Sequence, residues 1–574
     1  MSSNIEESAV AEGSVLYHNG HFVSSRNAVI EESHWLLVAG GVVREVGVGD
    51  VPSAIRSERK HDLLGRVVFP GLWDSHIHVY AVGAQLSSVD LEGCASITEL
   101  QDRTRQHLQL HGHATYLQGS GWDQALMGRI PTCEDLDACV GDVPAIFYRR
   151  CFHVCVLNSA ALVACGITAA TMDVDGGVVD RRPDGTPTGV LREAAMDVLL
   201  SPLLDVEVPT QLKKDRLWAG LQACVQRGIT AVQTNDCKDI GNISDAYDVY
   251  HALDDEKALP CRVFLTVGWK DVGSPGIPTA GSANSSGRLS CDRAKIWTDG
   301  ALGASTAALL EPYSDADDGN VGVMQMTPQE IDTAIQKVKS HGFRVEAHAI
   351  GDRAAKQLLQ SFERHLESGD RPVLTHCQIL TEDLVAQMAR SGTIANIQPQ
   401  FVPSDLHVVR ARLGEGQRLR WSYAWKTLLS RGVVLAGGSD APVEAPAPLV
   451  GMADAMDHVL HAHERLSFAE ALEMYTRSAA FAARAEDRLG GFEQGMGADF
   501  VVLDYTGPVG TISSADLRSA RVDQVYVQGR EVFSVAGTMD GVLPPPTPYI
   551  AGTTVAGKAG LLQHWRRGRC PCCR

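Results

Sequence analysis

Eight short apolar segments with strand character alternate with amphipathic helical segments through the middle of the 574-residue chain. Residues 327–342 and 381–392 are examples of the helical segments. A strand that is followed by a helix returns by a right-handed crossover, so such repeats build a parallel sheet. Eight repeats predict a TIM-type (β/α)8 barrel of the α/β class, with its active site at the C-terminal strand ends. The strand segments are residues 67–78, 228–236, 261–268, 293–300, 343–352, 371–379, 393–401 and 433–442.

The rest of the chain is predicted to form two further parts. Residues 80–220 follow the first strand and have strand and helix patterns of their own, so we expect an insertion that forms a lid or pocket wall. The strand-rich ends, residues 14–67 and 487–533, are expected to build a small β-sandwich from both termini. The barrel with its insertion then comprises residues 68–486.

Two tripeptides in these terminal segments are predicted to be hairpin turns. They are His18-Asn19-Gly20 and Gln528-Gly529-Arg530. Glycine supplies the positive φ that two-residue hairpin turns need, and both tripeptides lie between segments of strand character.

The two ends of the chain are expected to be disordered tails, residues 1–13 and 550–574. The second tail carries Cys570, Cys572 and Cys573. It has no second Cys or His pair at zinc-finger spacing, so we predict a basic tail without a metal.

Composition and charge exclude several classes of function. The 51 basic and 69 acidic residues give a formal net charge of −18, which argues against nucleic acid or an anionic membrane as a partner. No run approaches 18 apolar residues, so no transmembrane helix is expected. The N-terminus is polar and acidic, unlike a secretory signal, so we expect a cytoplasmic protein with reduced thiols. These features suit a small-molecule substrate, and they leave open a homodimer through the sandwich edge or the insertion.

Histidine and aspartate residues stand at the C-terminal ends of four predicted strands. His76 and His78 end the first strand, His348 and His376 end the fifth and sixth, and Asp440 follows the eighth. Side chains alternate along a strand, so a His-x-His pair points to one side. Three or four imidazoles and a carboxylate suit a borderline divalent ion such as zinc. The sequence therefore predicts a site for one or two metal ions at this rim.

Two further roles follow from that prediction. Two cations would need a bridging anion, and Lys295 at the end of the fourth strand could supply it if CO2 carboxylates its amine. A buried lysine can equally pair with a carboxylate, which would leave a mononuclear site. Asp440 is expected to bind the metal and to accept a proton from water, whose pKa the metal lowers.

Other patterns are not typical of a site. His461-Ala462-His463 is predicted to be helical or at a helix end, where side chains two residues apart do not share a face, and His111-Gly112-His113 lies in a polar loop. The chain contains no G-x-S-x-G elbow and no G-x-x-x-x-G-K-[ST] loop, so serine-nucleophile and nucleotide chemistry are unsupported.

Several motifs resemble a known family. FPGLWDSHIH, EAH, LTH, GSDAP and GMGADFVVLD are similar to the amidohydrolase superfamily of metal-dependent hydrolases. GWDQ, FYRRCFHVCVLNSAAL, PTGVLREAAMD, WTDGALG and WSYAWKTLL resemble its N-substituted formamide deformylase-like branch. The resemblance covers roughly residues 14–533 and implies a barrel with an appended β-sandwich and hydrolysis of C–N bonds. It also implies metal ligands at matching positions, which are His76, His78, His348, His376, Asp440 and a carboxylated Lys295.

The resemblance further implies which residues face the substrate. The matching positions are Trp122, Asp123, Arg150, His153, Asp299 and Trp425. One departure concerns the substrate itself. Relatives usually have Gly-Ser-Arg-Thr where this chain has Gly303-Ala304-Ser305-Thr306, so an arginine is lost and no relative's substrate is carried over.

Taken together, these patterns predict a zinc-type hydrolase that cleaves an amide-like or formamide-like C–N bond with metal-activated water. A deaminase or a cyclic-amide hydrolase would use the same site on the same barrel, so the motifs do not separate these reactions. A non-catalytic binding module with the same fold is a further alternative, and a complete ligand set argues against it.

Overall fold

The computed structural model describes residues 13–111, 116–149, 154–174, 177–204, 208–237, 239–240, 243–316 and 319–537. The predicted tails and the cysteines near the C-terminus lie outside these residues. The described chain divides into two compact units, one made of residues 80–220 and the other of residues 13–79 and 221–537. No helix in the described residues is long and apolar enough to cross a membrane.

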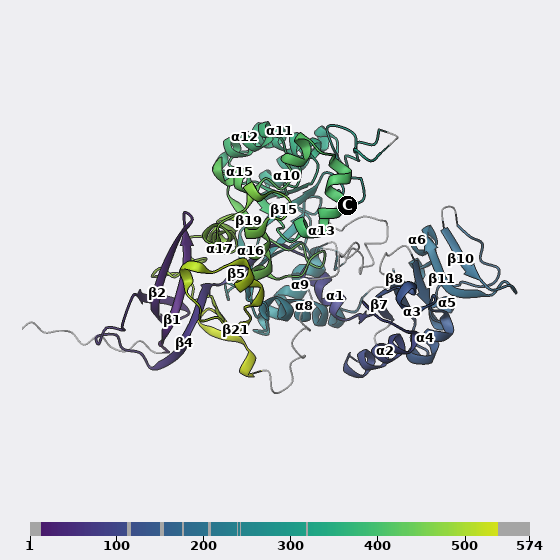
Figure 1. Ribbon diagram of the computed structural model, residues 1–574, viewed down its shortest axis with the longest axis horizontal. Helices are drawn as coiled ribbons and strands as arrows, with labels where there is room; N and C mark the ends of the chain where they lie inside the picture. Colours follow the sequence, from purple (N-terminus) through teal and green to yellow (C-terminus); the bar gives the residue numbers. More distant parts are fainter. Residues whose placement is uncertain are drawn as a thin grey trace, which may run out of the picture. The chain divides into compact units, whose positions relative to one another are not determined.

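A parallel sheet of eight strands forms the centre of the larger unit (Figure 1). In sheet order the strands are β19 (Leu435–Gly437), β18 (Ile394–Ile397), β17 (Val373–His376), β16 (Arg344–Ala349), β15 (Leu289–Trp297), β13 (Arg262–Gly268), β12 (Ile229–Thr234) and β5 (Leu72–Ile77). Backbone hydrogen bonds just beyond β5 and β19 bring the two edge strands together, so the sheet is a nearly closed barrel. The predicted TIM-type barrel is confirmed. Seven of the eight expected segments contain one of these strands, and the remaining segment, residues 293–300, overlaps β15, which begins earlier, at Leu289.

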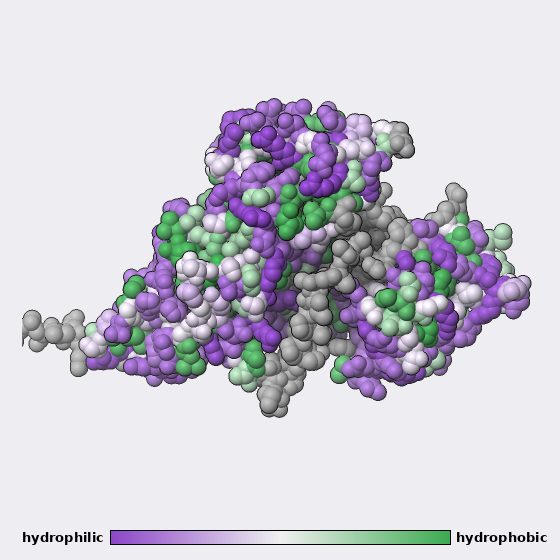
Figure 2. All heavy atoms as spheres, viewed as in Figure 1, coloured by the Kyte–Doolittle hydropathy of each residue, from purple (hydrophilic) through white to green (hydrophobic). Residues whose placement is uncertain are grey.

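Helices follow most barrel strands, as the sequence pattern predicts. Helix α8 (Thr210–Val225) contains the point in the sequence at which the two units divide. The helices that follow it in the larger unit are α9 (Ile243–Asp255), α10 (Pro328–Ser340), α11 (Asp352–His365), α12 (Glu382–Ser391), α13 (Phe401–Leu413), α14 (Gln417–Arg420), α15 (Trp425–Ser430), α16 (Pro448–Asp457), α17 (Phe468–Met474), α18 (Arg477–Ala482) and α19 (Ser514–Ser519). Helix α10 shows why they start where they do, because Thr327 and Glu330 form a capping box and Pro328 occupies the first turn. The outer surface around α11 and α12 is mainly hydrophilic (Figure 2), as expected for amphipathic helices that cover a barrel.

Both ends of the described chain join in one seven-stranded sheet of the larger unit. Its order is β22 (Arg530–Ser534), β21 (Val522–Val527), β20 (Phe500–Leu503), β4 (Arg59–Pro70), β1 (Val15–Arg26), β2 (Val29–Ala39) and β3 (Val42–Gly47). Val43 N and Ala498 N form backbone hydrogen bonds that link β3 to the segment before β20. The sheet thereby folds back around an apolar core that includes Tyr17, Phe500 and Tyr526. It fits the sandwich that was predicted from the two strand-rich ends.

One predicted hairpin turn is wrong and the other agrees with the structure. β1 runs without a break through His18-Asn19-Gly20, and its pairing with β2 shifts register there as a β-bulge. The positive φ of Asn19 serves this bulge, and the chain reverses later, at Asn27 and Ala28, which both have positive φ. Gln528 and Gly529 do form the expected turn between β21 and β22, with φ values of 52° and 67°.

A buried ion pair fastens the barrel to the terminal sheet. Arg262 on β13 contacts Asp499, the residue before β20, with its Nε atom 2.5 Å from Asp499 Oδ2. Asp499 also accepts a hydrogen bond from Gln528 N over 2.7 Å. Burial lowers the pKa of Arg262, but the Asp499 carboxylate outweighs burial and raises it, so the pair stays ionised.

Residues 80–220 form a unit with a sheet of their own. The sheet order is β10 (Gly177–Arg181), β11 (Pro187–Glu193), β9 (Val154–Leu157), β8 (Ala145–Arg149), β7 (Leu117–Trp122) and β6 (Val89–Asp90). Neighbouring residues of β8 alternate between two apolar cores, because Ile146 lies in one and Phe147 in the other. The helices in this part of the chain are α1 (Val79–Leu86), α2 (Ile97–His111), α3 (Gln124–Met127), α4 (Cys133–Val140), α5 (Ser159–Ala164), α6 (Ala194–Leu199) and α7 (Ser201–Leu204).

Candidate metal centre

Four buried histidines gather at the C-terminal ends of three barrel strands. His76 lies on β5 with His78 just after it, and His348 and His376 lie on β16 and β17. The ring centroids are 5.7 Å apart for His76 and His78, 5.6 Å for His76 and His376, and 4.5 Å for His348 and His376. The structure therefore brings together all four histidines that the sequence singled out.

Asp440 brings a carboxylate to the same point. Its Oδ1 atom lies 3.4 Å from Nε2 of His76 and 3.4 Å from Nε2 of His78. One ligand atom from each of these three residues lies within 4.8 Å of the others, and all three residues are buried. Burial raises the pKa of Asp440, but His76 and His78 outweigh burial and hold it well below its usual range. Asp440 is therefore an anion that faces two imidazole nitrogens.

Each of three histidines is held from behind through its Nδ1 atom. His78 Nδ1 lies 2.7 Å from Asp239 Oδ2, His376 Nδ1 lies 2.9 Å from Gln398 Oε1, and His76 Nδ1 lies 3.0 Å from Glu346 Oε1. Within the described residues, the Nε2 atoms of these histidines are buried and make no hydrogen bond. Acceptors behind metal-binding histidines orient the rings in this way in metal sites generally.

The electrostatics of the site also favour a cation. Burial lowers the pKa of His78, yet Asp239 and Asp440 outweigh burial and raise it to about 10. Anionic surroundings therefore stabilise positive charge at this imidazole. Three imidazole Nε2 atoms and a carboxylate form a donor set that fits a divalent ion such as zinc.

His348 is held differently from the other three histidines. Its Nε2 atom lies 3.1 Å from Asp299 Oδ1 and 3.2 Å from the carbonyl oxygen of Gly300. Asp299 in turn accepts backbone hydrogen bonds from Ala308, Ile350 and Gly351 over 2.8–3.1 Å. The buried Asp299 carboxylate therefore orients His348, which does not support its expected contact with a substrate.

Lys295 is part of a buried charge network beside the histidines. Its Nζ atom lies 2.7 Å from Glu346 Oε1 and donates to Thr375 Oγ1 over 3.3 Å. Glu346 also contacts Arg293 at 3.0 Å. Burial raises the pKa of Glu346, but Lys295 chiefly opposes this effect and the pKa lies well below its usual range. No role was predicted for Glu346 from the sequence, although an acidic residue in a buried barrel strand requires a buried partner.

The seam between β5 and β19 positions three of the candidate ligands. Asp440 N donates to the carbonyl oxygen of His76 over 2.7 Å, and His78 N donates to that of Ala441 over 2.9 Å. Asp74 adds a side-chain clamp, since it accepts from Ser439 Oγ over 2.5 Å and from Ser439 N over 3.0 Å. Asp440 also has a positive φ of 56°, an uncommon conformation for a residue with a side chain.

Replacing Gly438 with alanine is expected to weaken metal binding without removing a ligand. The new Cβ would lie 2.7 Å from His76 N and 3.2 Å from Asp74 Oδ1, so the seam must shift. We expect a loss of about 1–3 kcal/mol in the free energy of unfolding, measured by denaturant titration, and weaker zinc binding in a chelator competition. Gly303→Ala is the control, because nothing lies within 4 Å of the Cβ it would add. Equal behaviour of the two variants would contradict the expected role of the seam.

Three of the remaining residues expected to face a substrate are buried in this structure. Trp122 is 0% exposed in an apolar core of its own unit, and its Nε1 donates to Phe147 O over 2.9 Å. Asp123 is buried, caps α3 and pairs with Arg149 at 3.2 Å. Trp425 is 1% exposed, and its ring centroid lies 4.5 Å from that of His458, the residue after α16. Substrate contact by these three residues stays a prediction, and Arg150 and His153 lie outside the described residues.

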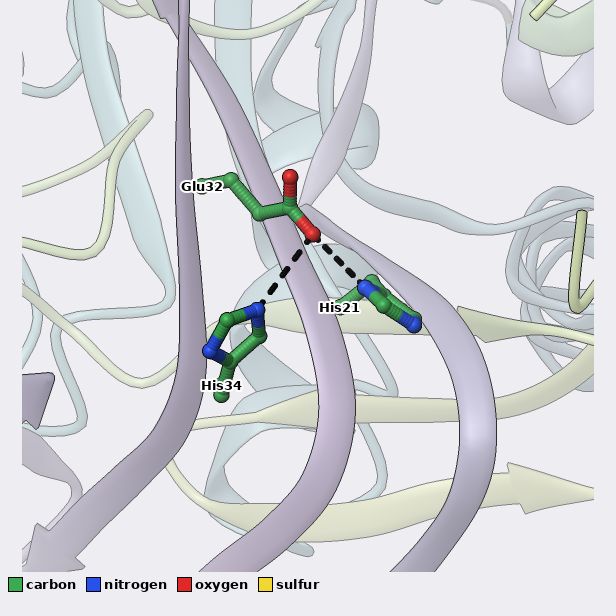
Figure 3. A group of neighbouring side chains, drawn as sticks. All are labelled: His21, Glu32 and His34. Carbon is green, nitrogen blue, oxygen red and sulfur yellow. Dashed lines mark hydrogen bonds and ion pairs between the residues drawn. The ribbon is translucent and has the colours of Figure 1, made fainter. Parts of the chain in front are cut away.

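A second cluster of possible ligands lies on the terminal sheet, but it does not fit a metal. His21, Glu32 and His34 lie together in Figure 3, and about a third of each side chain is exposed. His34 Nδ1 accepts a hydrogen bond from Gly49 N over 2.7 Å. A neutral imidazole that accepts at Nδ1 carries its proton at Nε2, the atom 3.6 Å from Glu32 Oε1. The Nε2 atom of His34, which faces Glu32, therefore has no lone pair with which to bind a cation.

Comparisons with known proteins agree with this geometry. The chain matches the model of the Amidohydrolase family over residues 60–533. The protein named "Putative amidohydrolase YtcJ" of Bacillus subtilis (strain 168) is 32% identical over 490 residues, which cover 82% of this chain and 90% of that protein. N-substituted formamide deformylase of Arthrobacter pascens is 24% identical, over 90% of this chain and 97% of that protein. The crystal structure of an uncharacterized metal-dependent hydrolase from Pyrococcus furiosus is 29% identical with a TM-score of 0.73, over 86% of this chain and 99% of that one.

Proposed function

Because the chain belongs to the amidohydrolase family of metal-dependent hydrolases, we propose that it hydrolyses an amide-like C–N bond in a small molecule. The family membership confirms the resemblance inferred from the sequence motifs. The observation that carries the proposal is the set of three buried Nε2 atoms, of His76, His78 and His376, that make no hydrogen bond within the described residues, two of them 3.4 Å from the Asp440 carboxylate. N-substituted formamides are the first substrates to test, since one relative is named for cleaving them.

The proposed metal ligands are the Nε2 atoms of three histidines and the carboxylate of Asp440, with His348 as a further candidate. A divalent cation, most suitably zinc, would supply Lewis acidity that lowers the pKa of a water molecule and polarises a carbonyl group. Asp440 would accept a proton from that water and return it to the leaving nitrogen. Asp239, Gln398 and Glu346 would hold the imidazole rings in position.

Two roles for Lys295 remain in the proposal. As a carboxylated residue it would bridge two cations, the second bound by His348 and His376, and its place at the end of β15 supports this role. As an ammonium group it would neutralise Glu346, and the 2.7 Å contact supports that role. Metal counting separates them, because Lys295→Met should lower two zinc equivalents to one or fewer in the first case. In the second case the wild type holds one zinc equivalent, and Lys295→Met leaves that zinc content unchanged.

The test of the proposed function combines metal content with a substrate panel. Protein purified without chelator is expected to hold one or two zinc equivalents by elemental analysis and to release acid and amine from at least one N-substituted formamide or linear amide. Release of ammonia from an amino-substituted heterocycle alone would instead identify a deaminase, and ring opening alone a cyclic-amide hydrolase. Bound metal without turnover on the whole panel would favour a binding module, and no metal at all would contradict the proposal.

A further inference from the structure

Two amide side chains connect His376 to the backbone of β5. His376 Nδ1 lies 2.9 Å from Gln398 Oε1, Gln398 Nε2 donates to Asn396 Oδ1 over 2.9 Å, and Asn396 Nδ2 donates to Ser75 O over 2.7 Å. All three side chains are buried. The chain of hydrogen bonds runs from β17 to β18 and on to the residue that precedes His76.

The direction of every hydrogen bond in this chain follows from its last link. The carbonyl oxygen of Ser75 can only accept, so Asn396 must turn its NH2 group towards it. Asn396 then turns its oxygen towards Gln398, so Gln398 must donate a hydrogen bond to that oxygen from its own NH2 group. The oxygen of Gln398 is left facing His376. An amide oxygen only accepts, so the proton of the neutral imidazole of His376 must sit on Nδ1.

We propose that Gln398 and Asn396 are positioning residues that hold His376 in the Nδ1–H tautomer and so present the lone pair of Nε2 to the metal cation. The inference rests on the proposed metal-dependent function and deepens it. The buried Nε2 atom makes no hydrogen bond within the described residues, so it is open to a metal. Phe401 stacks on the same ring, with centroids 6.1 Å apart and planes 15° apart, and limits its rotation.

The amide chain also relates two ligands on different strands. Ser75 O, where the chain ends, belongs to the residue next to His76 on β5. A shift of β5 would lengthen the Asn396 contact and loosen the orientation of both amides. The tautomer of His376 therefore depends on the position of β5, the strand that also positions His76.

The test measures the zinc affinity of variants at Gln398 by competition with a chromophoric chelator. Gln398→Met removes the acceptor at similar size and is expected to weaken zinc binding by about 10- to 100-fold. Gln398→Glu keeps an oxygen facing Nδ1 and is expected to stay within a few-fold of the wild type. A second variant, Asn396→Leu, breaks the chain one link further away and should weaken binding by less than Gln398→Met does.

Gln378→Met is the matched control. Gln378 is also a buried amide and lies two residues after His376, but its Nε2 atom donates to Asp405 Oδ2 over 2.9 Å and to Tyr423 OH over 2.5 Å. Its zinc affinity should equal that of the wild type. The melting temperature of every variant shows whether a loss of affinity reflects a loss of folding.

The outcomes separate this inference from the proposed function. A wild type that binds no zinc would contradict the proposed function itself. Tight zinc binding by the wild type together with equal affinities of Gln398→Met and Gln398→Glu would overturn the inference alone. The same conclusion would follow if Gln378→Met weakened binding as strongly as Gln398→Met. Weak binding by Gln398→Met that Gln398→Glu restores would support the inference.

Discussion

Replacing Asp440 with asparagine is expected to lower kcat by about 10²- to 10⁴-fold on any amide that the substrate panel identifies. Asparagine keeps the size of the side chain and one oxygen, but it cannot accept a proton from water. It also removes the negative charge that lies 3.4 Å from two imidazole nitrogens, so zinc affinity should fall as well. Measuring kcat at saturating zinc separates the loss of the proton acceptor from the loss of metal.

Asp454→Asn is the matched control for this prediction. Asp454 is a buried aspartate on α16 whose Oδ1 atom lies 2.8 Å from Arg518 Nη2. It belongs to the ion pairs between α16 and α19 and lies outside the proposed ligand set, so its kcat should stay near the wild-type value. If Asp440→Asn kept more than a tenth of the wild-type kcat at saturating zinc, Asp440 would not be the proton acceptor.

Removing the metal with a chelator is expected to abolish turnover and to destabilise the fold. A cation that binds only the folded state stabilises it by RT ln(1 + [L]/Kd), which is about 4 kcal/mol when the free ion is at 1,000 times its Kd. Without the cation, the buried Nε2 atoms of His76, His78 and His376 have no metal to bind and make no hydrogen bond within the described residues. Thermal unfolding before and after chelation measures the loss, and added zinc should restore both stability and turnover.

His76→Ala provides the control for chelation. This variant lacks a proposed ligand, so chelator should change its melting temperature much less than that of the wild type. Full activity in wild-type protein from which elemental analysis finds no remaining metal would contradict a metal-dependent mechanism.

The barrel and the gathering of histidines could be predicted from the sequence for a physical reason. Strands that are buried on both faces read as continuous apolar runs, and the polar residues of a barrel site stand at the ends of those runs. His76 and His376 therefore stand out against their neighbours. The bulge at Asn19 could not be distinguished from a turn, because a glycine and a positive φ suit both structures.

The side chains behind the histidines could not be predicted in the same way. Asp239 and Gln398 act on residues of other strands, and nothing in their local sequence says which strand end they will reach. Trp122 shows what a family position leaves open. It matches a family position and was expected to face a substrate, whereas the structure buries its indole in an apolar core.

The pairing of β4 has a consequence for the order of events when the chain is synthesised. β4 leads through Pro70 and Gly71 into β5, the strand that bears His76, and it pairs on one side with β1 and on the other with β20. Val68 on β4 can therefore pair with Val502 on β20 only after β20 has been synthesised. A nascent chain that already carries every proposed ligand still has an open sheet edge next to its first barrel strand. We expect the metal centre to mature only after the final strands have left the ribosome.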